Sequence, residues 1–114
     1  MTSNDGFWWG AGASSVITDG VAPASELAGG DAGGGTGPAG PWTDEVEAVV
    51  SSGLGHLRLT LEWARIEPNE GHVDDDAVEI MRQRLIVARD AGLSVWACLH
   101  DDTLPGWFAH DERG

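Results

Sequence analysis

The chain has 114 residues, a length that suits one small domain with a single hydrophobic core. Its 19 acidic residues outnumber six basic ones, all arginines, and give a formal net charge of -13. Such a field repels phosphate backbones and anionic lipid surfaces, so neither a nucleic acid nor a membrane surface is expected as a partner. A neutral ligand such as a sugar meets no such penalty.

Cys98 is the single cysteine, which excludes an intramolecular disulfide and a cysteine zinc cluster. Residues 1–6 carry no positive charge and no apolar stretch of the kind a secretory leader needs. No apolar run is long enough to span a bilayer. These features predict a cytoplasmic protein.

The first elements are a short strand and a loop. Residues 7–11, FWWGA, are aromatic and flanked by glycine, which favours a buried strand. Residues 29–41 hold seven glycines and two prolines, a composition that predicts a flexible loop. A phosphate-binding loop would need a following Gly-Lys-Ser/Thr, and the chain has no lysine, so no nucleotide or other cofactor is expected.

A helix and a strand follow the loop. Thr43 can cap a helix, and valines recur at helical spacing after it, so a helix is expected over about residues 43–52. Apolar and polar residues then alternate strictly over residues 57–63, LRLTLEW, which predicts a strand with one apolar and one polar face.

A second helix and a third strand complete the pattern. Three aspartates at 74–76 suit a helix N-terminus, and apolar residues at positions 78, 81, 85 and 88 form one stripe. Ala91 and Gly92 end this helix. Residues 94–99, SVWACL, are nearly all apolar, as in a strand covered on both faces.

Strands that alternate with helices over short connections predict an α/β fold with parallel pairing. The polar face made by Arg58, Thr60 and Glu62 does not suit a flat sheet covered by helices on both sides. It suits a barrel strand whose outer face meets helices and whose inner face ends in a site.

Three sequence blocks carry a family resemblance. FWWGA at residues 7–11 resembles the F-x-W-G-A opening of family 1 glycoside hydrolases, which are β-glucosidase-like, and RLTLEWARIEP at 58–68 resembles their R-x-S-x-x-W-x-R-I-x-P second strand. LHDDTLP at 99–105 resembles the L-[YH]-H-[WF]-x-L-P end of the third strand. The resemblance implies that residues 1–114 form a single incomplete segment of a (β/α)8 barrel, with three strands and two connecting helices.

The resemblance also implies a retaining β-glycosidase acting on O-glycosyl bonds of a neutral carbohydrate. In that family the acid/base glutamate ends the fourth strand and the nucleophile ends the seventh, so neither has a counterpart here. No catalytic residue is assigned, and these residues alone are expected to be inactive. The alternative is a non-catalytic binding or structural module that self-associates through open sheet edges.

Several sugar-contact positions depart from the family pattern. Ile17 and Asp19 stand where the family has the glutamine and glutamate of Q-x-E-G. Asp101 replaces the histidine that touches the sugar, and Asp102 replaces the aromatic residue after it. Arg58 is retained, and it is expected to lack its carboxylate partner, so that water or an outside partner must meet its charge.

The tryptophans divide between core and site. Trp63 and Trp96 fall in apolar patterns and are expected in the core, whereas Trp107 is the best exposed candidate for stacking on a sugar. The candidate substrate-binding residues are therefore Arg58, Asp101, Asp102 and Trp107.

Three specific hypotheses about catalysis or metal binding are less favoured than ordinary structural roles for the same residues. Glu62 with Asp101 or Asp102 could replace the missing carboxylates, but ordinary solvated acids are favoured. Cys98, His100 and Asp102 hint at a triad, but side chains two apart on a strand seldom converge, and a small buried cysteine is favoured. His100, Asp101 and Asp102, with His110, could bind a divalent ion only if the loop bent for it, so no metal is expected.

Overall fold

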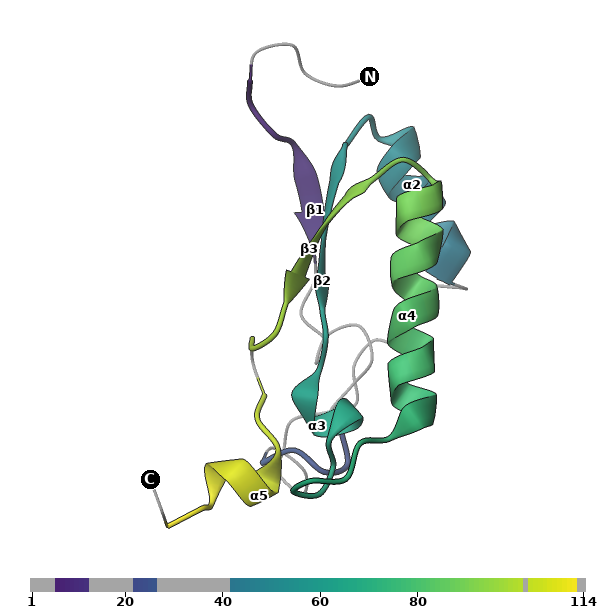
Figure 1. Ribbon diagram of the computed structural model, residues 1–114. Helices are drawn as coiled ribbons and strands as arrows, with labels where there is room; N and C mark the ends of the chain where they lie inside the picture. The colour runs from purple at the N-terminus through teal and green to yellow at the C-terminus, as the bar shows by residue number, and fades with distance from the viewer. Residues whose placement is uncertain (1–5, 13–21, 27–41, 102, 113–114) are drawn as a thin grey trace.

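A three-stranded parallel sheet forms the centre of the molecule. The computed structural model describes residues 6–12, 22–26, 42–101 and 103–112. Strands β1 (Gly10–Gly12), β2 (His56–Thr60) and β3 (Ser94–Cys98) lie in the order β1-β2-β3 (Figure 1). The register is continuous across the sheet, since His56 pairs with Gly10 on one side and with Ser94 on the other.

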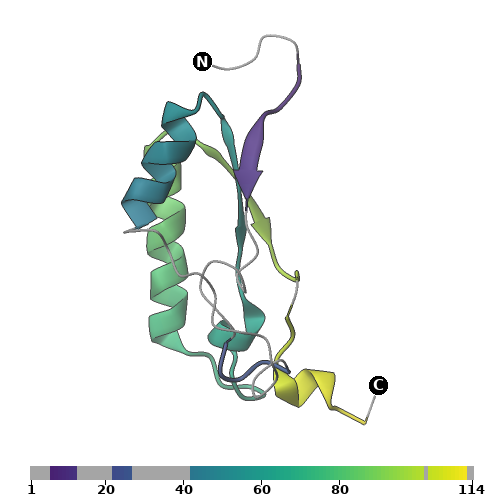
Figure 2. The same ribbon diagram turned by 180° about the vertical axis from the view of Figure 1, so that it is seen from behind.

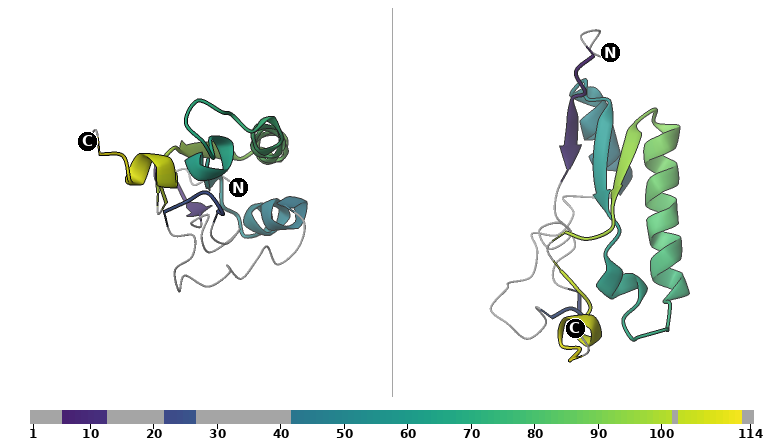
Figure 3. Two further views of the ribbon diagram at one scale, coloured as in Figure 1. Left: turned by 90° about the horizontal axis from the view of Figure 1, so that it is seen from below. Right: turned by 60° about the vertical axis from the view of Figure 1, so that its left-hand side comes forward.

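Two long helices cover one face of this sheet, and two short ones lie at its carboxyl end. The long helices are α2 (Trp42–Ser51) and α4 (Asp75–Asp90), and Figures 1 and 2 show both on the same side of the strands. The short helices α3 (Trp63–Ile66) and α5 (Gly106–Ala109) lie where the strands end (Figure 3). The predicted α/β fold with parallel strands is confirmed.

The hydrophobic core lies between the sheet and the two long helices. Leu57 of β2 packs with Val46 of α2 and with Ala88 and Leu93 at the end of α4, all four buried. Trp42 packs against this cluster and donates its indole N–H to the carbonyl of Arg84 at 3.0 Å. The odd-numbered residues of β2 therefore face the helices, and His56, Arg58 and Thr60 face the opposite side, which we call the open face.

The ends of α4 follow the expected chemistry. The carboxylate of Asp74 accepts a hydrogen bond from the backbone N–H of Ala77 at 3.1 Å, and Asp75 and Asp76 follow in the positive first turn. Gly92 has φ of 87° just after the helix, a conformation that residues with a side chain rarely adopt. The predicted helix bounds are thus confirmed within a residue or two.

The predicted strand over residues 57–63 is too long. β2 ends at Thr60, and Trp63 begins α3 instead of continuing the strand. The carbonyl of Glu62 accepts hydrogen bonds from the N–H groups of Arg65 and Ile66, so the backbone turns into a helix there. Alternation in the sequence could not reveal this turn, because Trp63 is apolar in either conformation.

The first and third strands are less covered than predicted. Trp8 is 65% exposed, Trp96 50% and Leu99 71%. In the described part of the chain the FWWGA segment is therefore not buried, and β3 is not covered on both faces. The segment's strand also begins later than expected, at Gly10. The reason is that helices cover only one face of the sheet, and only over part of its width.

Two further findings concern the chain as a whole. No helix among the described residues is long and apolar enough to cross a membrane. The glycine-rich segment predicted as a loop, residues 29–41, lies outside the described residues.

Candidate functional site

A polar cluster occupies the open face near the carboxyl ends of β2 and β3. The guanidinium Nη2 of Arg58 lies 3.2 Å from Oδ1 of Asp101 and 3.2 Å from the sulfur of Cys98. Thr60 donates its hydroxyl to Oδ2 of Asp101 at 3.3 Å, and the Cys98 thiol donates to the carbonyl of His100 at 3.1 Å. Both oxygens of Asp101 are thus held by side chains of β2.

Arg58 therefore has a carboxylate partner, Asp101, and the prediction that Arg58 lacks one is wrong. The hydrogen bond to Asp101, followed by the one to Cys98, raises the pKa of Arg58 above its ordinary value. The side chain of Arg58 is 45% exposed and that of Asp101 19%, so water also reaches the pair. Asp101 supplies the charge, because the segment after β3 runs beside the end of β2 and its following residues.

Glu62 is the buried carboxylate of this region, in contrast to the solvated acid expected. It is 2% exposed, and its two oxygens accept hydrogen bonds from Arg65 Nε at 2.7 Å and from the Thr103 hydroxyl at 2.9 Å. Glu62 thereby joins α3 to the segment after β3. The hypothesis that Glu62 and Asp101 form a catalytic pair loses support, since each is held by other side chains.

A second segment closes the same end of the sheet. Ser25 and Pro105 form an antiparallel bridge, and the N–H of Gly106 donates to the carbonyl of Ala24 at 2.8 Å. The carboxylate of Glu26 accepts a hydrogen bond from the N–H of Leu104 at 2.7 Å. Sequence reasoning missed this contact, because the partners are 78 residues apart and no local pattern marks either of them.

An aromatic cluster lies on the open face toward the amino end of the strands. Trp96 donates its indole N–H to Nδ1 of His56 at 3.0 Å, and Trp8 stacks on the same imidazole with ring centroids 5.4 Å apart. With Gly10, Gly12 and Arg58 these rings line an open hollow of about 450 Å³. Trp96 is thus not a core residue of the described chain, and His56 joins the open face, as the period of two in β2 could have indicated.

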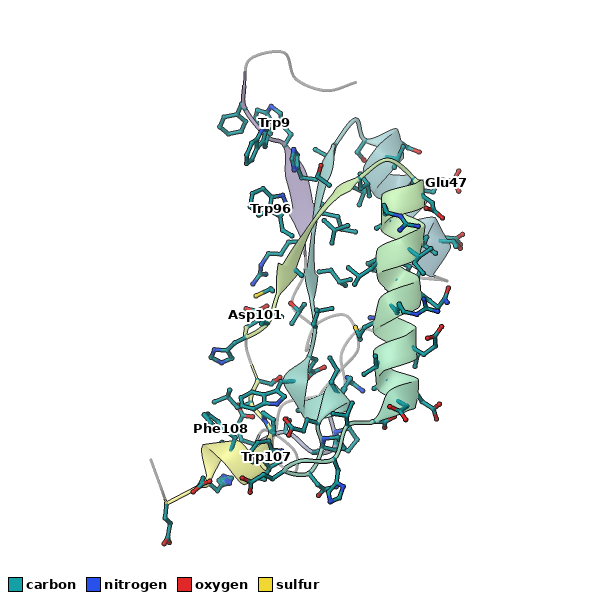
Figure 4. The ribbon with its side chains drawn as sticks, in the orientation of Figure 1. Trp9, Glu47, Trp96, Asp101, Trp107 and Phe108 are labelled. Carbon is teal, nitrogen blue, oxygen red and sulfur yellow. The ribbon has the colours of Figure 1, made fainter. Side chains whose placement is uncertain are left out.

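Trp63 and Trp107 meet beyond the carboxyl end of the sheet. Trp107 packs edge-on against Trp63 with ring centroids 5.5 Å apart, and Phe108 packs on Trp63 at 4.7 Å. Trp107 is half-buried, and its indole N–H donates to the carbonyl of Glu67 at 2.9 Å. Figure 4 shows Trp107 at α5, toward the C-terminus from Asp101, so the structure does not gather these two candidates into one cluster.

Three other predicted positions fall outside the part of the chain that the structure describes, whereas Cys98 lies within it. Ile17, Asp19 and Asp102 lie outside the described residues. Cys98 is half-buried and makes polar contacts with Arg58 and His100, so it is not simply a small apolar core residue. No group of histidine, cysteine and acidic residues able to hold a metal ion occurs within residues 6–12, 22–26, 42–101 and 103–112.

The fold and the position of the polar cluster define a segment of a (β/α)8 barrel, in which sites lie at the carboxyl ends of the strands. No protein-family model and no curated protein matches the sequence. Solved structures do match, and β-glycosidases are among them.

β-glucosidase 1317 matches 91% of the chain with a TM-score of 0.74 and 28% identity, and β-glycosidase BGL167 matches 90% with a TM-score of 0.74 and 24% identity. The β-glycosidase from Pyrococcus horikoshii matches 60% with a TM-score of 0.57 and 28% identity. The chain covers 28%, 27% and 16% of these three proteins respectively. The chain is therefore similar in structure to about a quarter of a β-glycosidase barrel.

Proposed function

We propose that the chain supplies the first three strands of a family 1-type retaining β-glycosidase, which hydrolyses O-glycosyl bonds of a neutral carbohydrate. The observation that carries the proposal is the match of 91% of the chain to β-glucosidase 1317 at 28% identity. The RLTLEWARIEP block at residues 58–68 supports the family assignment, since it forms β2 and α3 at the carboxyl end of the sheet.

Arg58 and Asp101 are the proposed sugar-site residues with the best support. Both lie on the open face, and a guanidinium and a carboxylate together offer the donors and acceptors that sugar hydroxyls require. Asp102 and Trp107 remain part of the proposal as further substrate contacts. The half-buried position of Trp107 leaves only part of its ring for stacking on a sugar.

The proposal holds that these 114 residues do not hydrolyse glycosides by themselves. A retaining glycosidase needs an acid/base and a nucleophile with carboxyl groups about 5 to 5.5 Å apart. Glu62 is fixed by Arg65 and Thr103, and Asp101 is fixed by Arg58 and Thr60, so neither is placed to protonate or attack a substrate.

A chimera tests the proposal. The matched segment of β-glucosidase 1317 is replaced by this chain, and hydrolysis of an aryl β-glucoside is measured for the chimera and for the isolated chain. We expect hydrolysis by the chimera alone. Arg58→Gln in the chimera should lower kcat/KM by about 100-fold, the order of effect seen when a charge-stabilising donor is removed.

Arg82→Gln is the matched control, because Arg82 lies on the exposed surface of α4 and pairs only locally with Glu79. Hydrolysis by the isolated chain would refute the claim of inactivity. A folded chimera with no hydrolysis, or equal activities of the Arg58 and Arg82 variants, would refute the glycosidase proposal.

A cytoplasmic location is part of the same proposal. It is supported by Cys98 being a lone free cysteine, since small secreted domains commonly depend on disulfides. The second candidate function is a non-catalytic module that self-associates, and the uncovered aromatic side chains of the open face favour it.

A further inference from the structure

Every second side chain from Arg58 onward meets the segment that follows β3. Arg58 pairs with one carboxylate oxygen of Asp101, and Thr60 donates its hydroxyl to the other. Glu62 lies just beyond β2, but its backbone is still extended, so the period of two continues. Its carboxylate accepts the hydroxyl of Thr103 at 2.9 Å. Three alternate side chains thus hold the second segment along its length.

Backbone pairing does not hold that segment beyond β3. The N–H of Leu61 donates to the carbonyl of Cys98 at 2.8 Å. After this bond, the polar contacts that join the two segments within the described residues all involve side chains. Side chains, and not the register of the sheet, therefore set where Asp101 lies.

These side-chain contacts differ in how far water reaches them. Arg58 and Asp101 are both partly exposed, and an ion pair open to water contributes little to holding two segments together. Glu62 and Thr103 are both buried, so breaking their hydrogen bond leaves polar groups unpaired away from water. The buried contact is the stronger constraint on the segment.

Glu62 is itself held in place. The Nε of Arg65 donates to its other carboxylate oxygen at 2.7 Å, and its carbonyl accepts the N–H groups of Arg65 and Ile66. Thr103 is two residues from Asp101, and a two-residue stretch spans at most about 7 Å. A shift of Thr103 relative to Glu62 is therefore passed on to Asp101.

A second anchor holds the far side of the same segment. Both the N–H and the carbonyl of Leu104 bond to Glu26. This anchor joins the segment to residues 22–26 and not to β2, so it does not fix the separation of Asp101 from Arg58. The buried link to the β2 side is made by Glu62.

We propose that Glu62 is a positioning residue of the sugar site: it holds Thr103 and thereby sets the place of Asp101 beside Arg58. This inference rests on the proposed function, in which Asp101 and Arg58 contact the sugar. Glu62 touches no substrate in this role, since both its oxygens are engaged and its side chain is buried. Its effect on hydrolysis passes through Asp101 and concerns how tightly the substrate is bound.

The first test uses the chimera with β-glucosidase 1317 and an aryl β-glucoside. Thr103→Val removes the hydroxyl with little change of shape, and Thr103→Ser is the matched control that keeps it. We expect the valine variant to raise KM about tenfold at nearly unchanged kcat, because a contact that binds the sugar equally in the ground and transition states is weakened. The serine variant should keep the KM of the unsubstituted chimera.

Glu62→Ala tests the positioning residue directly. Alone, it should raise KM by about as much as Thr103→Val. Combined with Thr103→Val it should raise KM no further, because the two residues act on Asp101 through one hydrogen bond.

Gly10→Ala shows what a loss of stability alone does. Gly10 lies in β1, and a Cβ there would lie 2.8 Å from the carbonyl oxygen of His56. A smaller folded fraction lowers the apparent kcat and leaves KM unchanged. This variant should therefore keep its KM, whereas the Thr103→Val variant should not.

Cys98 reports the same geometry without any activity. It is the single cysteine, and its thiol contacts Arg58 and the carbonyl of His100. In the isolated chain, Thr103→Val should speed the alkylation of Cys98 by iodoacetamide at least about threefold, because the segment then opens more often. Thr103→Ser should leave the rate unchanged.

Equal KM values for the valine and serine variants would overturn the inference, as would a KM that rises as much in Gly10→Ala. Equal alkylation rates of the valine and serine variants would overturn it too. An active chimera with these results rejects the positioning role alone. A folded chimera with no hydrolysis rejects the proposed function, and faster alkylation of the valine variant then still supports the link from Glu62 through Thr103 to Asp101.

Discussion

Glu62 lies between Arg65 of α3 and Thr103 of the segment after β3, and its carboxylate is almost fully buried. Removal of the carboxylate leaves the Thr103 hydroxyl and one Arg65 N–H without this acceptor. Breaking a buried pair is costly, because the remaining group has been taken out of water. Glu62 therefore links α3 to the segment after β3 at the carboxyl end of the sheet.

Glu62→Ala should lower the free energy of unfolding by about 3 kcal/mol. Thr103→Val, which removes only one of the two hydrogen bonds, should cost about 1 to 2 kcal/mol. Urea unfolding followed by tryptophan fluorescence measures both. Equal stabilities of wild type and Glu62→Ala would contradict the structural role of this carboxylate.

Glu67 links stability to pH. The indole N–H of Trp63, at 2.7 Å, and then the N–H of Gly71, at 2.9 Å, lower the pKa of Glu67. A lowered pKa in the folded state means that the unfolded state binds the proton more readily. The stabilisation is thus present above the unfolded pKa of about 4.3 and is lost as the pH falls through the lower folded value.

Glu67→Gln should therefore flatten the loss of stability between about pH 5 and pH 3. Urea midpoints measured across this range test the prediction. Glu47→Gln is the control, since Glu47 lies on α2 and points away from the sheet (Figure 4). If the two variants lose stability with pH in parallel with wild type, the hydrogen bonds to Glu67 do not set the acid response.

At the scale of elements, the strands β1 and β2 approach each other closely at Gly10 and Gly12. A Cβ added to Gly10 would lie 2.8 Å from the carbonyl oxygen of His56, and one added to Gly12 would lie 2.9 Å from Cβ of Arg58. Backbone atoms cannot move aside as a flexible side chain can. The absence of side chains at Gly10 and Gly12 thus allows β1 to pair with β2 while Trp8 reaches the imidazole of His56.

Gly10→Ala should destabilise the chain by about 1 to 3 kcal/mol, the range expected for overpacking. It should also release Trp8 from His56, which near-ultraviolet circular dichroism would detect. Gly55→Ala is the matched control, because a Cβ there meets no atom within 4 Å. The same loss of stability in both variants would show that the close approach of the strands is not responsible, since alanine by itself lowers the entropy of the unfolded chain and stabilises the fold.

The elements themselves were largely predictable. Val46 and Val49 of α2 and the capping Asp74 of α4 carry local signals, since periodicity and capping depend only on residues within a turn or two. The end of β2 was not predictable, because Trp63 leaves the strand to pack on Phe108, more than 40 residues away. The exposure of β3 was also hidden, since it depends on what lies beside the strand.

At the scale of the whole molecule, the six arginines offset only part of the acidic charge and leave a net charge of -13. Repulsion among these negative charges opposes the compact, folded state. Salt screens this repulsion: the Debye length falls from about 30 Å at 0.01 M to about 8 Å at 0.15 M. The three acidic residues at positions 74–76 lie together at the start of α4 and add to the effect.

Raising sodium chloride from about 0.01 M to about 0.15 M should therefore raise the urea midpoint of the chain. Sodium chloride is the salt to use, because sulfate strengthens apolar burial by a separate effect. A midpoint that falls as salt is added would indicate that the ion pairs, such as Arg58 with Asp101, outweigh the general repulsion.

By itself, the sequence determined the order of elements, the parallel α/β class and the place of Arg58 on the polar face of a strand. These follow from local periodicity and from a motif confined to residues 58–68. Only the tertiary structure decided that Asp101 is the partner of Arg58, that Glu62 is buried against Thr103, and that Glu26 reaches Leu104. Each of these contacts joins residues about 40 or more apart in the chain. At such separations the sequence pattern within one segment cannot show which side chains meet, because the register of one strand against the next decides it.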